Sequence, residues 1–435
     1  RRVHGEVDDR DTRERGRDFA EVETEESLSS MGFPSSDDAV LIKKGKDPAD
    51  PLLVTVNCPD RTGLACDLFR IILDFGLRIF KGDVSTDGKW CYLVLWLTPQ
   101  YETLVPWHNL RHRLMSACPS SCSVSFYLNQ PPPPQSPSLV YLLKIICFGR
   151  KGLLHDITKA LCDLELTIQR VKVSKTPDDR ATDLFFVTDN LELLHTRRRQ
   201  EEAYAELRSV LGESCTCEIH VAAAEYQQQH DTGIVHPSIS DLLAVKEFPD
   251  RQPCDVSFDN SLSPAHTLLQ INCGDHKGLF YHMMKTLKDF DLKIAHGRLG
   301  KSERGRREVD LFVQRGDGGK VVEREAQRAV RRRLEEEVAS PVRVRVAQRG
   351  PDTEVVVANS VEASGRGRPR VFFDVTLAVR SLGLCVFSAE IGRIWWDDRE
   401  WEVYRFLLED NEMLRMVSDQ SLFKCVTATL MGSSA

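Results

Sequence analysis

Residues 54–64 read VTVNCPDRTGL, a run of alternating apolar residues that ends in a Pro-Asp-Arg-Thr-Gly turn. The following LACDLFRIILDFGL has the three- and four-residue apolar spacing of a helix that buries one face. The apolar face comprises Leu64, Leu68, Ile72 and Phe75. The stretch therefore predicts a strand that passes through a sharp turn directly into an amphipathic helix.

This pattern recurs as LLKIICFGRKGLLHDITKALCDLEL from Leu142 and as LLQINCGDHKGLFYHMMKTLKDFDL from Leu268. In each copy a cysteine closes the strand and a Gly-Leu pair ends the turn: Cys58, Cys147 and Cys273; Gly63, Gly152 and Gly278; Leu64, Leu153 and Leu279. A fainter fourth copy combines TEVVVAN with RVFFDVTLAVRSLGL and has Arg370 at the glycine position. Such an internal repeat indicates four copies of one small unit.

Each copy continues with a two-strand segment, a second helix and a last strand. RRRQEEAYAELRSVLG followed by CTCEIHVA is the clearest case, and EREAQRAVRRRLEEEVA followed by PVRVRVA is another. We expect each unit to be a two-layer α+β sandwich, with helices on one face of an antiparallel sheet. The other sheet face must then be solvated or covered by a partner.

The predicted boundaries follow the repeats and the composition between them. Four domains are expected at residues 51–128, 139–223, 265–348 and 352–431. Between them lie a Pro-rich linker at residues 129–138 and a polar linker at residues 224–264. The charged N-terminal segment, residues 1–50, is predicted to be disordered because it has few apolar residues.

The composition excludes some classes of protein. A net charge of −7 over 435 residues provides no general attraction to nucleic acid or to an anionic membrane. The thirteen cysteines are scattered without a zinc-site spacing, so we expect no metal and no cofactor, with free thiols in a reducing compartment. We expect the protein in the cytoplasm, the nucleus or both, without membrane association.

The chemistry of the turn suggests a ligand. A helix N-terminus carries partial positive charge, and glycine lets a ligand approach the backbone closely. Asp60 and Asp275 add a negative charge beside that positive end. This combination suits a zwitterion such as an amino acid. In the alternative interpretation the Asp or Thr side chain merely caps the helix and glycine permits the bend.

The stretch VNCPDRTGLACDLFRIILDFGLRIFKGDVSTDGKWCYLVLWL resembles the repeats of the plant ACT-domain repeat (ACR) family. SGRGRPRVFFDVTLAVRSLGLCVFSAEIG resembles the divergent last repeat of the subgroup containing members nine and ten. The resemblance covers the chain from about residue 50 onward. It implies four tandem ferredoxin-like βαββαβ (ACT) domains, a regulatory role, and amino-acid ligands held at interfaces between paired domains.

Carried over by position, the resemblance implies ligand sites at the first and third turns. The implied residues are Asn57, Asp60, Arg61, Thr62, Gly63, Leu64 and Val84, and Asn272, Asp275, His276, Lys277, Gly278 and Leu279. The second turn has Ile146 and Gly149 where the first has Asn57 and Asp60. The second and fourth units are therefore expected to be structural partners, in a homo-oligomer or within one chain.

Three other functions compete with an amino-acid sensor. The dipeptides His155-Asp156 and His230-Asp231 superficially suggest a metal-dependent phosphohydrolase, but further ligands are missing, so we expect no catalytic residues. Residues 365–370, GRGRPR, match the core of an AT-hook and suggest DNA contact, against the acidic composition. The third alternative is a protein–protein interaction scaffold without a small ligand, with an unknown protein partner.

Overall fold

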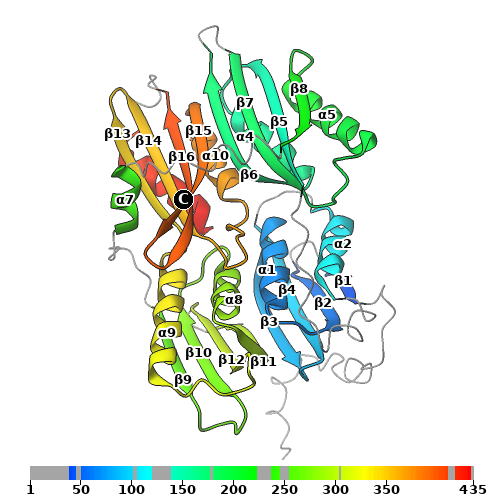
Figure 1. Ribbon diagram of the computed structural model, residues 1–435, viewed down its shortest axis with the longest axis vertical. Coiled ribbons are helices and arrows are strands. Elements are labelled where there is room, and N and C mark those ends of the chain that lie inside the picture. Colours follow the sequence, from blue (N-terminus) through cyan, green and yellow to red (C-terminus); the bar gives the residue numbers. More distant parts are fainter. Residues whose placement is uncertain are drawn as a thin grey trace, which may run out of the picture.

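The computed structural model describes residues 39–45, 50–100, 105–119, 139–176, 180–222, 237–244, 254–302, 305–409 and 417–432. Within these ranges the chain forms four α+β units, each with helices on one face of an antiparallel sheet (Figure 1). The predicted fold class is confirmed.

The elements of the four units follow in chain order. The first unit contains β1 (Val40–Lys43), β2 (Leu52–Pro59), α1 (Leu64–Asp74), β3 (Leu77–Thr86), β4 (Trp90–Pro99) and α2 (Trp107–Ala117). The second contains β5 (Val140–Phe148), α4 (Leu153–Asp163), β6 (Leu166–Lys175), β7 (Arg180–Asp189), α5 (Arg197–Leu211) and β8 (Thr216–Val221), and α7 (Pro237–Ala244) follows it. The third contains β9 (Asp255–Asp259), β10 (Thr267–Cys273), α8 (Leu279–Asp289), β11 (Leu292–Lys301), β12 (Arg307–Arg315) and α9 (Arg324–Ala339). The fourth contains β13 (Arg343–Arg349), β14 (Asp352–Ser360), α10 (Val371–Ser381), β15 (Val386–Trp396), β16 (Arg399–Leu408) and α12 (Asp419–Met431).

The units pair within the chain, in alternation. The first and third share an eight-stranded sheet in the order β1-β2-β4-β3-β11-β12-β10-β9. The second and fourth share another in the order β13-β14-β16-β15-β6-β7-β5-β8. The joins are antiparallel, with Val84 opposite Gly297 in one sheet and Val173 opposite Ala389 in the other. The units that meet in each sheet are therefore never neighbours in sequence.

Three predictions about edge strands were wrong. PVRVRVA does not close the third unit; as β13 it pairs with β14 across the turn at Gly350-Pro351, because so short a connection favours a hairpin. β9, from the stretch expected to be a polar linker, pairs with β10 instead. β1, from the segment expected to be disordered, pairs with β2 and buries Val40 completely. The expected last strand of the first unit lies outside the described residues.

The predicted helix face is confirmed in α1. Leu64, Leu68 and Ile72 are at most 2% exposed, and Phe75 packs partly buried against the same core. Each shared sheet has one continuous apolar core beneath its helices. The two units of each pair therefore share one hydrophobic core as well as one sheet.

The turn before the first helix of every unit has a left-handed backbone. Its φ is 79° at Gly63, 73° at Gly152 and 78° at Gly278, values that glycine adopts without a Cβ penalty. Arg370 adopts 65° at the same position, which costs about 1–2 kcal/mol for a non-glycine residue. Its guanidinium donates a 2.9 Å hydrogen bond to the carbonyl of Asp74 and lies 4.2 Å from the Phe373 ring, which offsets that cost.

The second face of the fourth unit's sheet is covered by α7. Leu242 and Leu243 of this helix pack on Val356, Trp401 and Val403. The Arg343 guanidinium donates a 2.6 Å hydrogen bond to the Leu243 carbonyl, which fixes the end of the helix. The chain itself therefore covers part of a face that we expected to be solvated or covered by a partner.

Candidate functional site

The first predicted turn is filled by the chain's own side chains. Asp60 accepts a 2.8 Å hydrogen bond from the Thr86 hydroxyl, and burial raises the pKa of Asp60. Arg61 forms a 2.5 Å ion pair with Asp67. The side chain of Lys288 passes 2.8 Å from where a Cβ on Gly63 would lie. The remaining predicted residues are the half-buried Asn57, the exposed Thr62, and Leu64 and Val84 in the core.

The third predicted turn is closed by two arginines. Asp275 lies 2.5 Å from Arg78 of the first unit and 2.8 Å from Arg307. Burial raises the pKa of Asp275, but hydrogen bonds from both guanidinium groups outweigh it, so the net pKa is lowered. The cavity beside this aspartate has a volume of about 20 Å³, room for a water molecule and not for an amino acid.

Other residues of the third turn also have protein partners. Asn272 accepts a 2.5 Å hydrogen bond from Arg306, and His276 is bonded to the carbonyl of Val338 at 2.9 Å. Lys277 is 1% exposed and donates to both oxygens of Asp374 at 2.8 Å. A Cβ on Gly278 would meet Leu73 at 3.0 Å, and Leu279 belongs to the core. Ligand binding at the first and third turns stays a prediction.

A larger cavity lies at the second turn, where we predicted only a structural role. Its volume is about 230 Å³, and it lies between the second and fourth units. Its polar lining comprises Arg150, Lys151, His155, Ser174, Lys175, Asp183, Thr376, Arg380, Cys385 and Glu409. Its apolar lining includes Leu153, Leu154, Val173, Val379, Leu384 and Phe387.

Asp183 is the unusual member of this lining. It is 1% exposed, and its Oδ1 atom has no hydrogen-bond partner among the described residues. Burial raises the pKa of its carboxyl to about 7. A buried polar atom without a partner is rare because desolvation costs about 1–3 kcal/mol. Asp183 is thus a buried carboxyl beside a cavity with one oxygen that no described residue satisfies.

The sequence carries a signal for Asp183 that becomes visible only when the repeats are aligned strand by strand. β7 places it opposite Ile145, at the position where the other units have Leu93, Val309 and Tyr404. These three side chains are buried, so an acid in this row interrupts an otherwise core-facing pattern. A charged residue at a core position is unfavourable unless it is paired or functional.

Positive charge is also gathered at the second turn. Arg150 and Arg380, from different units, each lie 2.5 Å from a carboxylate oxygen of Asp156. The turn leads into α4, whose N-terminus carries partial positive charge. Lys175 is 3.2 Å from Glu409 on the fourth unit. The cavity thus combines a buried carboxylate with arginines and a helix N-terminus.

The two His-Asp dipeptides do not support a metal-dependent phosphohydrolase. His155 Nδ1 lies 3.2 Å from the Thr376 hydroxyl, and Asp156 is used by the two arginines. Burial, with a contribution from Arg380, lowers the pKa of His155 to about 4, so the imidazole is neutral at pH 7. His230-Asp231 lies outside the described residues.

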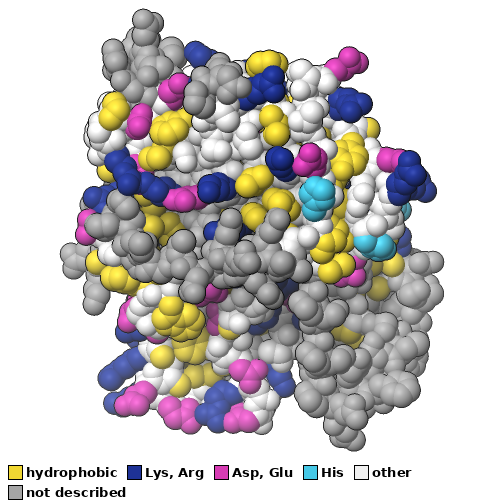
Figure 2. Space-filling view, turned by 45° about the horizontal axis from the view of Figure 1, so that its top comes forward, with side chains coloured by type: hydrophobic (Ala, Val, Ile, Leu, Met, Phe, Trp, Pro, Cys, Tyr) yellow, Lys and Arg dark blue, Asp and Glu magenta, His cyan; other side chains and the backbone are white. Residues whose placement is uncertain are grey.

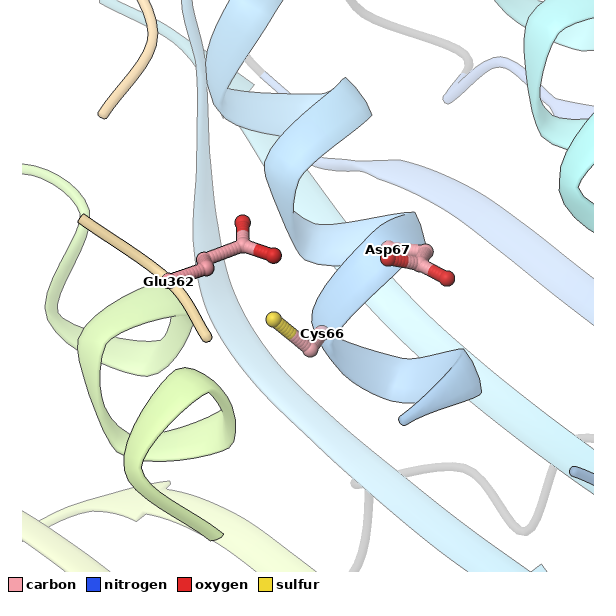
Figure 3. A group of neighbouring side chains, drawn as sticks. All are labelled: Cys66, Asp67 and Glu362. Carbon is pink, nitrogen blue, oxygen red and sulfur yellow. The ribbon is translucent and has the colours of Figure 1, made fainter. Parts of the chain in front are cut away.

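Cys66, Asp67 and Glu362 form a compact group of potential metal ligands (Figure 3). Basic side chains already surround it: Lys288 lies 3.1 Å from Asp67 and 3.3 Å from Glu362, and Arg366 contacts both carboxylates. Although burial raises the pKa of Glu362, the nearby Arg70, Arg366 and Lys288 lower it to about 2. Burial raises the pKa of Cys66 to about 12, which keeps the thiol protonated. We assign this group to ion pairing between the first and fourth units.

The contacts of Arg366 and Arg368 argue against an AT-hook at residues 365–370. Arg366 is committed to the ion pairs with Asp67 and Glu362. Arg368 is 3% exposed and donates to the carbonyls of Lys277 and Leu430 at 3.2 and 2.8 Å. Arginines that hold the protein together are not available to a minor groove. On the face in Figure 2, basic side chains lie beside acidic ones rather than in a uniform patch.

None of the described helices is long and apolar enough to cross a membrane.

Comparison with known families identifies three of the four units. Residues 42–119 match the family described as ACT domain-containing protein ACR10, N-terminal. Residues 255–352 match the family described as ACR9-like, ACT-like domain, and residues 353–432 match ACT domain-containing protein ACR9, C-terminal. The family matches therefore include the first, third and fourth units.

Whole-chain relatives agree with these matches. ACT domain-containing protein ACR9 of Arabidopsis thaliana is 49% identical over 407 residues, covering 91% of this chain and 99% of the relative. ACT domain-containing protein ACR10 of the same plant is 43% identical over 428 residues, covering 91% and 98%. The bifunctional uridylyltransferase/uridylyl-removing enzyme of Rhodospirillum rubrum is 25% identical over 252 residues, but only 24% of that enzyme is covered. The chain belongs to the plant ACR family of ACT-domain repeat proteins, in the group that contains ACR9 and ACR10.

Proposed function

We propose that this protein is a non-catalytic sensor, acting in the cytoplasm or the nucleus, that binds a free amino acid between its second and fourth units. The observation that carries the proposal is the unpaired, buried carboxylate oxygen of Asp183 in the 230 Å³ cavity. Asp183 would hold the ammonium group of the ligand. The N-terminus of α4 would attract its carboxylate, and Arg150 and Arg380 would share their contact with Asp156 with it.

The size of the cavity fits such a ligand. A volume of about 230 Å³ lies just below the ~300–1,000 Å³ of pockets for drug-sized molecules, which suits about ten heavy atoms. At roughly 0.5–0.8 kcal/mol per atom, the binding free energy is about −5 to −8 kcal/mol. The corresponding dissociation constants, micromolar to sub-millimolar, match the concentrations of free metabolites.

Residues from both units line the cavity, so its occupancy affects how the units pair. Arg380 and Thr376 belong to α10 of the fourth unit, and His155 belongs to α4 of the second. A ligand that contacts both helices stabilises one arrangement of the pair over others. We infer that occupancy is passed in this way to a protein partner.

A thermal-shift screen of the full chain against the twenty amino acids tests the proposal. A ligand that binds only the folded form raises the melting temperature, and the shift grows with ligand concentration. If Asp60→Asn or Asp275→Asn abolishes the shift while Asp183→Asn keeps it, the site lies at the first or third turn instead. If no amino acid produces a shift, the scaffold function is favoured.

Gly152→Ala and Gly350→Ala form a matched pair for the same screen. Both glycines have φ near 70°, so each alanine should cost about 1 kcal/mol of stability. A Cβ on Gly152 meets the Arg380 side chain at 3.3 Å, whereas nothing lies within 4 Å of one on Gly350. We expect a roughly five- to tenfold loss of ligand affinity in Gly152→Ala alone, measured by calorimetry. Equal losses in both variants would place the ligand elsewhere.

Ligand affinity should depend on pH because of Asp183. With a pKa of about 7 in the empty cavity, the carboxyl is largely protonated at pH 6 and ionised at pH 8. An ammonium group pairs with the ionised form, so affinity should rise roughly fivefold from pH 6 to pH 7, reach roughly tenfold by pH 8 and then level off. Titration calorimetry in the same buffer series should show a flat profile for Asp183→Asn. A flat profile in the unmodified protein would contradict this role.

A further inference from the structure

The cysteine that closes the first strand has a second cysteine beside it in three of the four units. In the third unit the β9–β10 register places Asp255 opposite Asn272, so the next positions are Cys254 and Cys273. In the second unit the β5–β8 register places Thr216 opposite Ile146, and the next positions are Cys215 and Cys147. In the first unit the partner is Cys118 at the end of α2, whose thiol lies close enough to that of Cys58 for each to shift the pKa of the other.

The backbone register of the second- and third-unit pairs suits a disulfide. Directly opposed residues of antiparallel strands have Cα atoms about 4.5–5.5 Å apart, within the roughly 4.4–6.8 Å that a disulfide spans. The Cys254 and Cys273 thiols are also close enough to shift each other's pKa in opposite directions. In the first unit, Arg61 donates a 3.3 Å hydrogen bond to the Ala117 carbonyl and holds the end of α2 beside the turn. Closing Cys254–Cys273 requires no change of strand register.

The three pairs differ in the exposure and in the pKa of their thiols. Cys118 and Cys254 are partly exposed, and the hydrogen bond from the partner thiol lowers the pKa of each. Cys58 and Cys273 are buried, and the same hydrogen bond together with burial raises the pKa of each. Each of these two pairs thus has one partly exposed thiol of lowered pKa and one buried partner, the arrangement of a redox-responsive dithiol.

The pair of the second unit lacks this asymmetry. Cys147 and Cys215 are both buried, and burial raises the pKa of both thiols, that of Cys147 to about 12. Neither thiol offers an accessible thiolate to an oxidant. The chain therefore contains its own control pair, similarly placed in the repeat but with both thiols buried.

We propose that Cys58–Cys118 and Cys254–Cys273 are redox-responsive pairs that close into disulfides with glutathione disulfide as oxidant, while Cys147–Cys215 stays reduced. The Cys254 thiolate attacks one sulfur of glutathione disulfide, which forms a mixed disulfide and releases one glutathione thiolate. Cys273 then loses its proton to solvent and attacks Sγ of Cys254, which releases the second glutathione. Two protein thiols are oxidised by two electrons, and one glutathione disulfide is reduced to two glutathione molecules. Cys118 and Cys58 react in the same order.

Both disulfides would act on the sheet shared by the first and third units. Cys58 and Cys273 each lie two residues before the turn aspartates, Asp60 and Asp275. Closure fixes the end of α2 to one turn and the start of β9 to the other. The modification is independent of the cavity between the second and fourth units, so its test does not depend on the proposed ligand.

The experiment equilibrates the full chain in a series of glutathione/glutathione disulfide ratios. Free thiols are trapped with N-ethylmaleimide after acid quenching, and linked peptides are mapped by mass spectrometry. At the ratio that half-converts Cys254–Cys273, we expect a comparable Cys58–Cys118 link and less than about a tenth as much Cys147–Cys215 link. Cys118→Ser and Cys254→Ser should each remove only their own link, and Cys215→Ser should change neither; all three spare the buried Cys58 and Cys273.

Each of the following outcomes would contradict a different part of the proposal. Cys147–Cys215 closing at the same ratio would overturn the selectivity. Glutathione remaining on Cys118 and Cys254 without internal links, or a Cys118–Cys122 link in place of Cys58–Cys118, would overturn the corresponding pair. A link in only one unit would overturn the assignment of the other.

Discussion

Asp183→Asn should stabilise the ligand-free protein at pH 8 by roughly 2–4 kcal/mol. The native carboxyl has a pKa of about 7 against 3.8 in its reference state, so the folded protein retains a proton that the unfolded chain has lost. The folded state therefore loses stability as the pH rises from about 4 to 7, at about 1.4 kcal/mol per pKa unit of difference. An uncharged amide avoids this ionisation cost. Urea unfolding at pH 5 and pH 8 should show the gain growing with pH.

The same substitution should abolish most of the ligand response. Loss of a charge-assisted hydrogen bond to an ammonium group costs about 1.5–3 kcal/mol, or roughly 10- to 150-fold in affinity. Asp310→Asn is the control, since that aspartate is only half-buried and accepts a 2.9 Å hydrogen bond from Gln270. We expect it to change stability by less than about 1 kcal/mol and binding not at all. An Asp183→Asn protein that is less stable at pH 8 and still binds would show a structural aspartate.

Lys277→Met should destabilise the protein by about 3–5 kcal/mol, as is typical when one partner of a buried ion pair is removed. Lys277 and Asp374 are at most 1% exposed, and they join the third turn to α10 of the fourth unit. Without the lysine, the carboxylate of Asp374 is buried with its main counter-charge gone. Denaturant unfolding measured by far-UV circular dichroism would show this loss as a lower midpoint.

Two further variants define what the Lys277 result means. The double variant Lys277→Met/Asp374→Leu should recover most of the lost stability, because no unpaired charge remains. Lys159→Met removes an exposed pair with Asp163 at 2.7 Å and should cost less than about 1 kcal/mol. A Lys277→Met effect as small as that of Lys159→Met would mean that water or another cation satisfies Asp374.

The sequence predicted those features that depend on local spacing. The Gly-Leu landmarks located three turns, and the helix face repeated from Leu68 and Ile72 located the fourth, because steric and periodic constraints act within a few residues. The edge strands β1, β9 and β13 were assigned wrongly because the position of an edge strand depends on which neighbouring strand lies nearer in space. Residues 343–349 show this: their composition suits a strand in either unit, and the short turn at Gly350 selected the fourth.

The candidate site was harder to predict because its decisive contacts cross between units. Arg78 closes the third turn from the first unit, and Arg380 reaches the second turn from the fourth. The residues that flank Asp275 and Gly152 in the sequence give no indication of these contacts. Asp183 was detectable in principle, as an acid in a core-facing row, but alignment of the third strands of all four repeats was needed to see it.

The alternating order of the shared sheets has a consequence for how the chain is made. During synthesis the first unit leaves the ribosome long before the third. The edge of β3 therefore stays unpaired until β11 has been synthesised. The second unit then waits in the same way for β15 of the fourth. Pairings so distant in sequence slow folding and expose strand edges to other chains. Newly made protein should therefore depend on chaperones until its last unit is complete, and a truncation after the second unit should aggregate although two units are present.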